Sequence, residues 1–249
     1  MRAPPTPTWF QVQPDSRARF RLFCFPYAGG SSAIYRPWVK RIHPDIEVVP
    51  AVLPGREFRL RDTAFTHIEP LVEELTREIS PHLDRPFALF GHSMGALISF
   101  ELARRLRSER GIEPVHLFVS GRRAPQLPER DPEIHNLPDA EFVTEVERLK
   151  GTPKEVLEHA ELMEILIPML RADFSICRQY DYVPGAPLTC PLTVFGGTKD
   201  DSADQEKLEG WCAQTTGRCR IRMLEGDHFF INQQHAAILP IIAETLLAS

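Results

Sequence analysis

The sequence predicts an α/β fold in which helices flank a mostly parallel, twisted β-sheet. Three observations lead to this prediction: short runs of β-forming residues, helical patterns that alternate with them, and one long interval without a strand pattern. The six strand-like runs are "RFRLFCF" (19–25), "IEVVPAVL" (46–53), "RPFALFG" (85–91), "PVHLFVSG" (114–121), "CPLTVFGG" (190–197) and "RCRIRMLEG" (218–226).

The helical patterns lie between these runs and after the last one. They cover residues 32–42, 67–83, 94–110, 203–215 and 230–248. Because strand, helix and strand follow one another in this rhythm, we expect parallel strands whose crossover helices cover both faces of the sheet.

The interval 122–183 interrupts this rhythm. A Pro-rich connection leads into the helical segments "EFVTEVERLK", "KEVLEHAELMEILIPML" and "RADFSICRQY". A connection of this length inside a parallel sheet is usually functional. We therefore expect a single domain, residues 1–249, with a helical lid insertion at about 122–183. The alternative is that these helices only thicken the core.

Composition excludes several classes of protein. The chain has 249 residues, a net charge of −5 and a hydrophobic content of 43%, which are ordinary values for a globular enzyme. A general nucleic-acid binder would carry a basic face, and no apolar run is long enough for a membrane span. The N-terminus has no apolar signal region. We expect a soluble, unprocessed protein.

The cysteines predict neither a disulfide framework nor a zinc site. Their number is odd and they form no CxxC pair. They are Cys24, Cys177, Cys190, Cys212 and Cys219. This usage fits the reducing cytoplasm best.

One short segment carries a catalytic motif. Gly91-His92-Ser93-Met94-Gly95 lies between the strand-like "FALF" and the helix-like "ALISFELARRL". It matches the G-x-S-x-G nucleophile elbow, a tight strand-to-helix turn that raises a serine above the carboxyl edge of an α/β-hydrolase sheet. Glycines are needed because side chains two residues before and after the serine would collide. Ser93 is the predicted nucleophile.

A serine nucleophile needs a histidine base that is oriented by a carboxylate. In α/β-hydrolases the acid and then the histidine follow the serine in the chain, each after a strand. "TVFGGTKDD" ends one late strand with Asp200 and Asp201, and "RMLEGDHFF" follows the next with His228. Chain order therefore predicts His228 as the base and leaves both aspartates open as its acid.

Two backbone amides are needed to stabilise the oxyanion of acyl transfer. Met94, which follows the nucleophile, supplies the first. The second is expected from the loop "PYAGG" (26–30) after the first strand, where glycines let the backbone approach a reacting centre. Taken alone, this loop is also compatible with a plain turn before a helix.

Six segments together resemble the motif series of one family. They are "FPYAGGSSAIYRPW", "LPGRE", "GHSMGALISFELARRL", "LIPMLRADFSICRQYDY", "CPLTVFGGTKDD" and "GDHFFIN". From about residue 9 to the C-terminus, the chain resembles the type II thioesterases that accompany polyketide and non-ribosomal peptide synthases. This resemblance implies Ser93, Asp200 and His228 as the triad, and the amides of Ala28 and Met94 as the oxyanion hole. Many members have a histidine where this chain has Tyr27.

The resemblance also implies a function. Members hydrolyse aberrant or stalled acyl groups from the phosphopantetheine arm of acyl or peptidyl carrier domains, which would be the partners here. A thioester is an activated acyl donor, so the chemistry needs no metal and no organic cofactor. We expect a cytoplasmic monomer that binds neither nucleic acid nor membrane. The alternatives are a medium-chain acyl-releasing thioesterase of a fatty acid synthase and a small-substrate carboxylesterase.

Residues of the lid are candidates for the wall of a substrate channel. A long, thin phosphopantetheine arm would reach the serine through such a channel, and the helices between about 139 and 180 could form its roof. The candidates recur every three or four positions, as one helical face requires: Met163, Leu166, Met169, Leu170 and Phe174. Core packing is the alternative role for each of them.

The segment "PGREFRLR" (54–61) adds arginines near the expected mouth of the channel. Because carrier proteins are usually acidic, a positive rim there would aid their encounter. Alternatively, Arg56 and Glu57 could form a structural ion pair under the lid.

Overall fold

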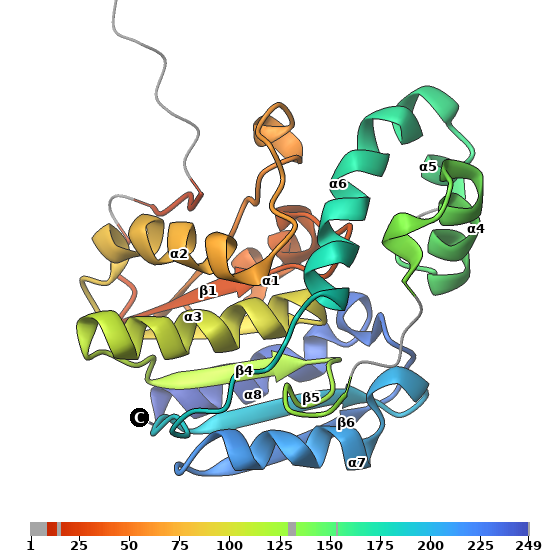
Figure 1. Cartoon of the computed structure of the whole chain (residues 1–249). Helices are drawn as coiled ribbons and strands as arrows, with labels where there is room; N and C mark the ends of the chain where they lie inside the picture. Colours follow the sequence, from red (N-terminus) through yellow and green to blue (C-terminus); the bar gives the residue numbers. More distant parts are fainter. Residues whose placement is uncertain (1–8, 14–15, 129–132, 153, 249) are drawn as a thin grey trace, which may run out of the picture.

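The structure is a computed structural model that describes residues 9–13, 16–128, 133–152 and 154–248 (Figure 1). Six parallel strands form one sheet in the order β2-β1-β3-β4-β5-β6. The strands are β1 (Phe20–Phe25), β2 (Ile46–Pro50), β3 (Phe87–His92), β4 (His116–Ser120), β5 (Leu192–Gly197) and β6 (Cys219–Leu224). Each predicted run corresponds to one strand, so the predicted α/β sheet is confirmed.

Helices cover both faces of this sheet, also as predicted. Those outside the interval 122–183 are α1 (Arg36–Arg41), α2 (Ile68–Ile79), α3 (Met94–Arg110), α7 (Gln205–Glu209) and α8 (His235–Leu247). One apolar cluster packs α2 and α3 on one face, and it includes Leu75 and Leu102. A second cluster packs α1 and α8 on the other face, through Trp38 and Ile242. The helix expected over 203–215 is shorter, because α7 continues as the 3-10 helix η6 (Gly210–Gln214).

The interval between β4 and β5 holds three helices, α4 (Asp139–Leu149), α5 (Lys154–Leu157) and α6 (Ala160–Arg178), while residues 129–132 and 153 lie outside the described ranges. The segment expected over 154–170 divides into α5 and the first part of α6, and the segment expected over 171–180 continues α6, which runs through Pro168. Figure 1 shows α6 rising from the carboxyl edge of the sheet, with α4 and α5 beside it. Within the described ranges, no helix is both long and apolar enough to cross a membrane.

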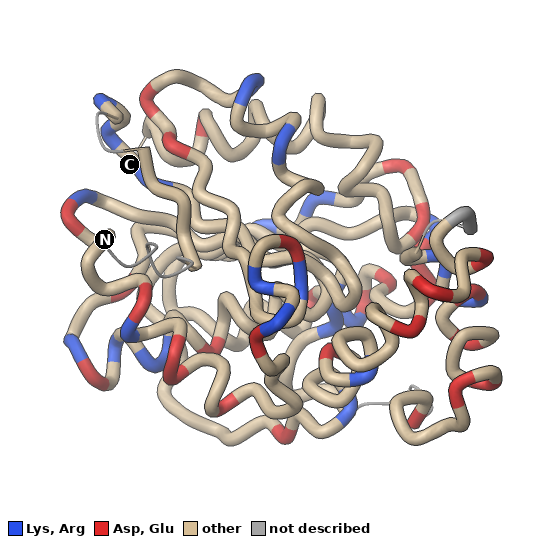
Figure 2. The backbone as a smooth tube through the Cα atoms, turned by 90° about the horizontal axis from the view of Figure 1, so that it is seen from above, with Lys and Arg blue, Asp and Glu red and all other residues tan. Residues whose placement is uncertain are grey.

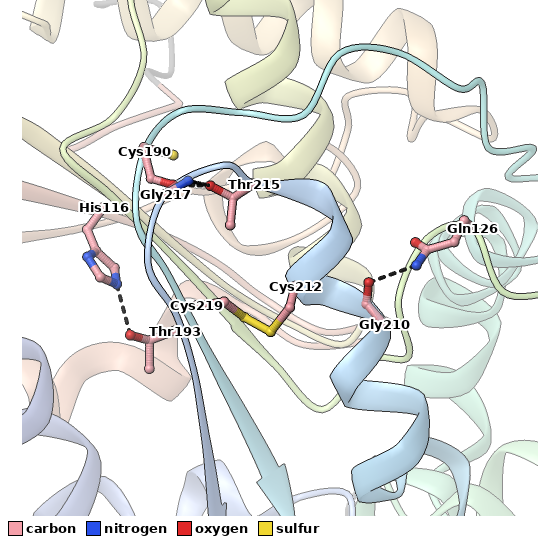
Figure 3. The surroundings of a disulfide bond; sticks show 9 residues. All are labelled: His116, Gln126, Cys190, Thr193, Gly210, Cys212, Thr215, Gly217 and Cys219. Atoms are coloured by element: carbon pink, nitrogen blue, oxygen red, sulfur yellow. Dashed lines mark hydrogen bonds between the residues drawn. A yellow bond between two sulfur atoms is a disulfide. The ribbon is translucent and has the colours of Figure 1, made fainter.

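The expectation of no disulfide is wrong for one pair of cysteines. Cys212 in η6 and Cys219 at the start of β6 form a disulfide (Figure 3). The pair could not be predicted from the sequence, because its spacing matches no common motif. In the fold, the turn after η6 brings the two Cα atoms to 5.4 Å. Cys24 and Cys190 are buried thiols outside any disulfide.

Candidate active site

The elbow has the strained geometry that the motif predicts. Ser93 joins β3 to α3 with φ of 53° and ψ of −112°, a conformation that non-glycine residues rarely adopt. A Cβ atom on Gly91 would lie 1.8 Å from the carbonyl oxygen of Gly95, and one on Gly95 would lie 2.1 Å from that of Phe25. Only glycine fits at both positions. The amide of Ser93 donates to the Ser120 carbonyl at 2.8 Å, which fixes the turn against β4.

His228 and Asp200 meet beyond the ends of β6 and β5. The Nδ1 atom of His228 lies 2.7 Å from Oδ2 of Asp200. Because the carboxylate accepts a hydrogen bond, this pairing assigns the proton to Nδ1 and leaves Nε2 able to accept one. The pair therefore has the orientation that a histidine base requires.

The structure separates the two adjacent aspartates. Asp200 is 5% exposed, whereas Asp201 is exposed to solvent. Asp200 also accepts hydrogen bonds from the amide and hydroxyl of Ser202, at 3.1 and 2.6 Å. Burial alone would raise the pKa of Asp200, but hydrogen bonds from His228 and Ser202 outweigh burial and hold this pKa below its ordinary value. The carboxylate paired with His228 is thus ionised at neutral pH.

His92 has a structural role that the sequence did not indicate. Its Nε2 atom donates to the backbone carbonyl of His228 at 2.8 Å, so Nδ1 accepts from the Ser120 hydroxyl at 2.8 Å. Burial, with a smaller contribution from His228, lowers the pKa of His92 to about 3. His92 is therefore a neutral, fully buried side chain that supports the loop of His228 through a hydrogen bond to its backbone. The G-H-S-M-G motif contained this residue, but the motif does not indicate its contact with the loop of His228.

The two amides predicted to form the oxyanion hole belong to Met94 and Ala28. Met94 is the first residue of α3, where amides have no acceptor within the helix. Ala28 follows β1 in the loop 26–30 and lines the same cavity as Ser93.

The site opens into a cavity of about 440 Å³. Ser93, Asp200 and His228 line it together, and residues of α4 and α6 form its other wall. This volume lies within the range of about 300–1,000 Å³ that is typical of ligand pockets. The structure therefore brings the predicted triad residues to one chamber beneath the inserted helices.

The five lid candidates divide into two groups. Leu170 and Phe174 line the cavity. Met163 and Met169 are buried in an apolar cluster with Phe142, against which Leu166 packs, and the cavity lining that the structure describes does not include these three residues. For them the core-packing alternative fits better.

Two of the three arginines of the segment 54–61 are buried and so cannot form the expected rim, whereas Arg61 is exposed. Arg56 and Arg59 are 4% and 8% exposed, and Arg56 pairs with Asp173 of α6. The suggested Arg56–Glu57 ion pair is also wrong, because Glu57 accepts from the amide and hydroxyl of Ser32 at 2.7 Å each. Cationic side chains reach the cavity from other segments, and the sequence analysis did not identify them as rim residues: Arg122, Arg123, Arg148, Lys150, Arg178 and Lys199.

The arrangement suits acyl transfer. A serine at a helix start and a histidine oriented by an ionised carboxylate are parts from which such sites are built. Within the described ranges, no group of three or more His, Cys, Asp or Glu side chains could hold a metal ion.

Comparison with known proteins identifies the family of the chain. The family model of the Thioesterase domain matches residues 20–249. The chain is 45% identical to the gramicidin S biosynthesis protein GrsT of Aneurinibacillus migulanus over 239 residues, which cover 96% of this chain and 93% of that protein.

Two solved structures extend the comparison. RedJ, a thioesterase from the prodiginine pathway of Streptomyces coelicolor, has a TM-score of 0.87 and 38% identity, covering 98% of this chain and 96% of RedJ. The type II thioesterase BorB from the borrelidin cluster has a TM-score of 0.88 and 34% identity, covering 97% of this chain and 99% of BorB. The chain belongs to the thioesterase domain family and, within it, to the type II thioesterases.

Proposed function

We propose that this enzyme hydrolyses acyl thioesters on the phosphopantetheine arm of acyl or peptidyl carrier domains, and so clears aberrant or stalled chains from a polyketide or non-ribosomal peptide synthase. One observation carries the proposal: Ser93 and the hydrogen-bonded pair of His228 and Asp200 line one cavity roofed by α6. The similarity to GrsT, RedJ and BorB supports the choice of substrate class.

In the first half of the reaction, the Ser93 hydroxyl attacks the thioester carbonyl while Nε2 of His228 takes its proton. The amides of Ala28 and Met94 donate to the oxyanion as it forms. When the intermediate collapses, the carbon–sulfur bond breaks. The leaving thiolate takes the proton from His228, and the acyl group remains as an ester of Ser93.

In the second half, a water molecule replaces the thiol. His228 takes a proton from this water as its oxygen attacks the acyl-enzyme, and returns that proton to Ser93 as the ester breaks. Ionised Asp200 stabilises the imidazolium that forms in each half. No metal or organic cofactor enters these steps.

The inserted helices serve as the lid in this proposal. Residues 1–249 act as one domain, and the insertion at about 122–183 roofs the cavity through Leu170 and Phe174 of α6. The acyl chain extends along these two side chains. The buried cluster around Phe142 gives the lid its own core, so its helices can hold their shape away from the sheet.

The charges around the cavity favour a carrier-bound substrate. Six arginine or lysine side chains line it, against three aspartates: Asp200, Asp201 and Asp227. Three of the six cations also pair with glutamates outside the lining, in the ion pairs Arg148–Glu145, Arg178–Glu133 and Lys199–Glu225. In Figure 2, Asp and Glu outnumber Lys and Arg along the lid helices. Glu161 and Glu164 of α6 are exposed there. An acidic carrier and its phosphodiester are therefore attracted to the cavity rather than to the outer lid. We place the encounter in the cytoplasm, with the enzyme as a monomer.

A competition assay tests this function. The kcat/KM for a decanoyl thioester on a carrier domain is compared with those for the same acyl group on a free pantetheine thiol and on an oxygen ester. The proposal predicts the highest value for the carrier substrate. A higher value for the oxygen ester would indicate a carboxylesterase instead. A preference for long unbranched chains over acetyl and propionyl would indicate the acyl-releasing alternative.

A further inference from the structure

A buried ion pair connects the lid to the loop after β1. Asp173 of α6 is 1% exposed and Arg56 is 4% exposed. Oδ1 of Asp173 accepts from Nη2 of Arg56 at 2.6 Å, and Oδ2 accepts from Nη1 at 3.0 Å. The same Oδ2 accepts from the backbone amide of Gly29 at 2.8 Å. The Asp173 carboxylate therefore binds both the Arg56 guanidinium and the Gly29 backbone amide.

Arg56 completes this connection from the other side. Its Nη1 atom donates to the Gly30 carbonyl at 2.8 Å, and the Gly30 amide donates to the Tyr27 carbonyl at 2.8 Å. The residues 27–30 are thus held at both ends of the turn. Gly29 has φ of +77°, and a Cβ atom on it would lie 2.6 Å from Cδ2 of Leu170, so α6 packs directly on the backbone of this loop.

These contacts fix the two peptide planes that flank Ala28. In a trans peptide the C=O and N–H bonds both lie in the peptide plane and point in opposite directions. The Tyr27 carbonyl accepts from Gly30, so the Ala28 amide hydrogen is turned away from that bond. The next plane carries the Gly29 amide, which Asp173 holds. The direction of the Ala28 amide is therefore set by the hydrogen bonds around it.

A contribution of this ion pair to the stability of the fold does not explain the arrangement well. Desolvation of two charges offsets much of their attraction, and replacing a buried ion pair by apolar residues is often neutral or stabilising. A paired carboxylate that also accepts from a backbone amide can instead fix that amide in one orientation. A fixed orientation matters where an amide must be preorganised for a developing charge.

We propose that Asp173 and Arg56 are positioning residues that aim the Ala28 amide at the oxyanion, and that they make the oxyanion hole depend on the seating of lid helix α6. The inference rests on the proposed role of Ala28. Neither residue lines the cavity as the structure describes it, so both act through the loop 27–30 rather than on the substrate.

Three variants test the inference. Asp173→Asn weakens the ion pair. The paired variant Arg56→Met/Asp173→Leu replaces the ion pair by apolar side chains and leaves no buried uncompensated charge. Asp139→Asn is the control for loss of another lid ion pair, because Asp139 accepts from Arg171 at 2.7 Å, and Arg171 donates otherwise to the carbonyls of His135 and Leu137. Thermal unfolding of each variant is measured first, to establish that it is folded.

The decisive readout is the ratio of two affinities. A decanoyl trifluoromethyl ketone thioether accepts the Ser93 hydroxyl at its carbonyl carbon and becomes a tetrahedral oxyanion, while the serine proton passes to His228. The matching thioether without the carbonyl has no such oxygen. We expect Asp173→Asn and the paired variant to lower kcat and ketone affinity by about 10- to 100-fold. Their KM and thioether affinity should stay within about threefold of wild type. Asp139→Asn should change neither kcat nor the ratio of ketone to thioether affinity.

Either of two results would overturn the inference: a folded paired variant with wild-type kcat, or equal losses of ketone and thioether affinity. The Ser93→Ala variant separates this failure from failure of the proposed function. If Ser93→Ala still hydrolyses decanoyl carrier thioester, the function is wrong whatever Asp173 does. If Ser93→Ala is inactive and the paired variant is fully active, only the positioning role is wrong.

Discussion

The Nε2 atom of His92 lies 2.8 Å from the backbone carbonyl oxygen of His228, so the residue before the nucleophile supports the loop of the catalytic base. Removing this support should move the base. We expect His92→Leu to lower kcat by about 10- to 100-fold, because a displacement of about 1 Å can cost this much.

A second buried histidine provides the control for that experiment. His116 bonds to the Thr193 hydroxyl at 2.9 Å and is absent from the cavity lining that the structure describes. His116→Leu should lower the melting temperature while kcat stays within about twofold of wild type. Equal losses of kcat in the two variants would show that the His92 effect is general destabilisation.

The same two histidines predict how stability depends on pH. Burial lowers the pKa of His92 from 6.5 to about 3, and burial together with Arg220 lowers that of His116 from 6.5 to about 4. Between these values the unfolded chain binds protons that the native protein does not. The free energy of unfolding therefore falls as pH drops from 6.5 toward 4.

Urea denaturation at several pH values checks this expectation. His92→Gln should give a shallower fall of the unfolding free energy over this pH range than the wild type. An unchanged slope would mean that His92 is not held neutral by burial.

Some of this site was predictable because it is local in the chain. The elbow needs a strand, a turn with two glycines and a helix, all within 87–110, so Ser93 could be identified directly. His228 followed from chain order. Asp173 and Arg56 are separated by 117 residues and come from different elements, so their pairing depends on the tertiary fold.

For the lid helix α6, the sequence pattern could not assign a role to each apolar side chain. The apolar positions of α6 follow one helical periodicity, yet the helix uses them against two surroundings, its own cluster and the cavity. Periodicity indicates that Met163 and Phe174 lie on an apolar face of α6, but it does not distinguish packing in a buried cluster from lining a cavity. The disulfide of Cys212 and Cys219 was missed for a related reason, since a turn brought the pair together.

Adjacent aspartates give a sharp test of the triad. Asp200→Asn should lower kcat by about 10² to 10⁴, because the amide cannot stabilise the imidazolium of His228. Asp201→Asn is the matched control and should cost under about tenfold, since this side chain is exposed and Asp200 already holds His228. Steady-state kinetics on one acyl carrier thioester measures both. The reverse ranking would assign the acid to Asp201.

Chain-length selectivity should respond to the cavity face of α6. Phe174 lines the cavity and packs edge-on against Phe142, with ring centroids 6.0 Å apart. We expect Phe174→Trp to reduce the space for the acyl chain and to raise the ratio of acetyl to decanoyl kcat/KM by about tenfold or more. One unwanted methylene in a filled pocket already costs about 1–3 kcal/mol.

Met163→Trp is the control for this experiment, since Met163 is buried in the lid cluster. It should lower the melting temperature and leave the acetyl to decanoyl ratio unaltered. If Met163→Trp changed the ratio as strongly as Phe174→Trp, the division of α6 into two faces would be incorrect.

The central claim is that Ser93 carries the acyl group, and the kcat of Ser93→Ala measures it most directly. Wild-type and variant enzymes are assayed at saturating decanoyl carrier thioester, with circular dichroism spectra to establish that the variant is folded. We predict an unchanged spectrum and a kcat lower by about 10⁴ or more. Hydrolysis by folded Ser93→Ala at a rate near that of the wild type would contradict the mechanism.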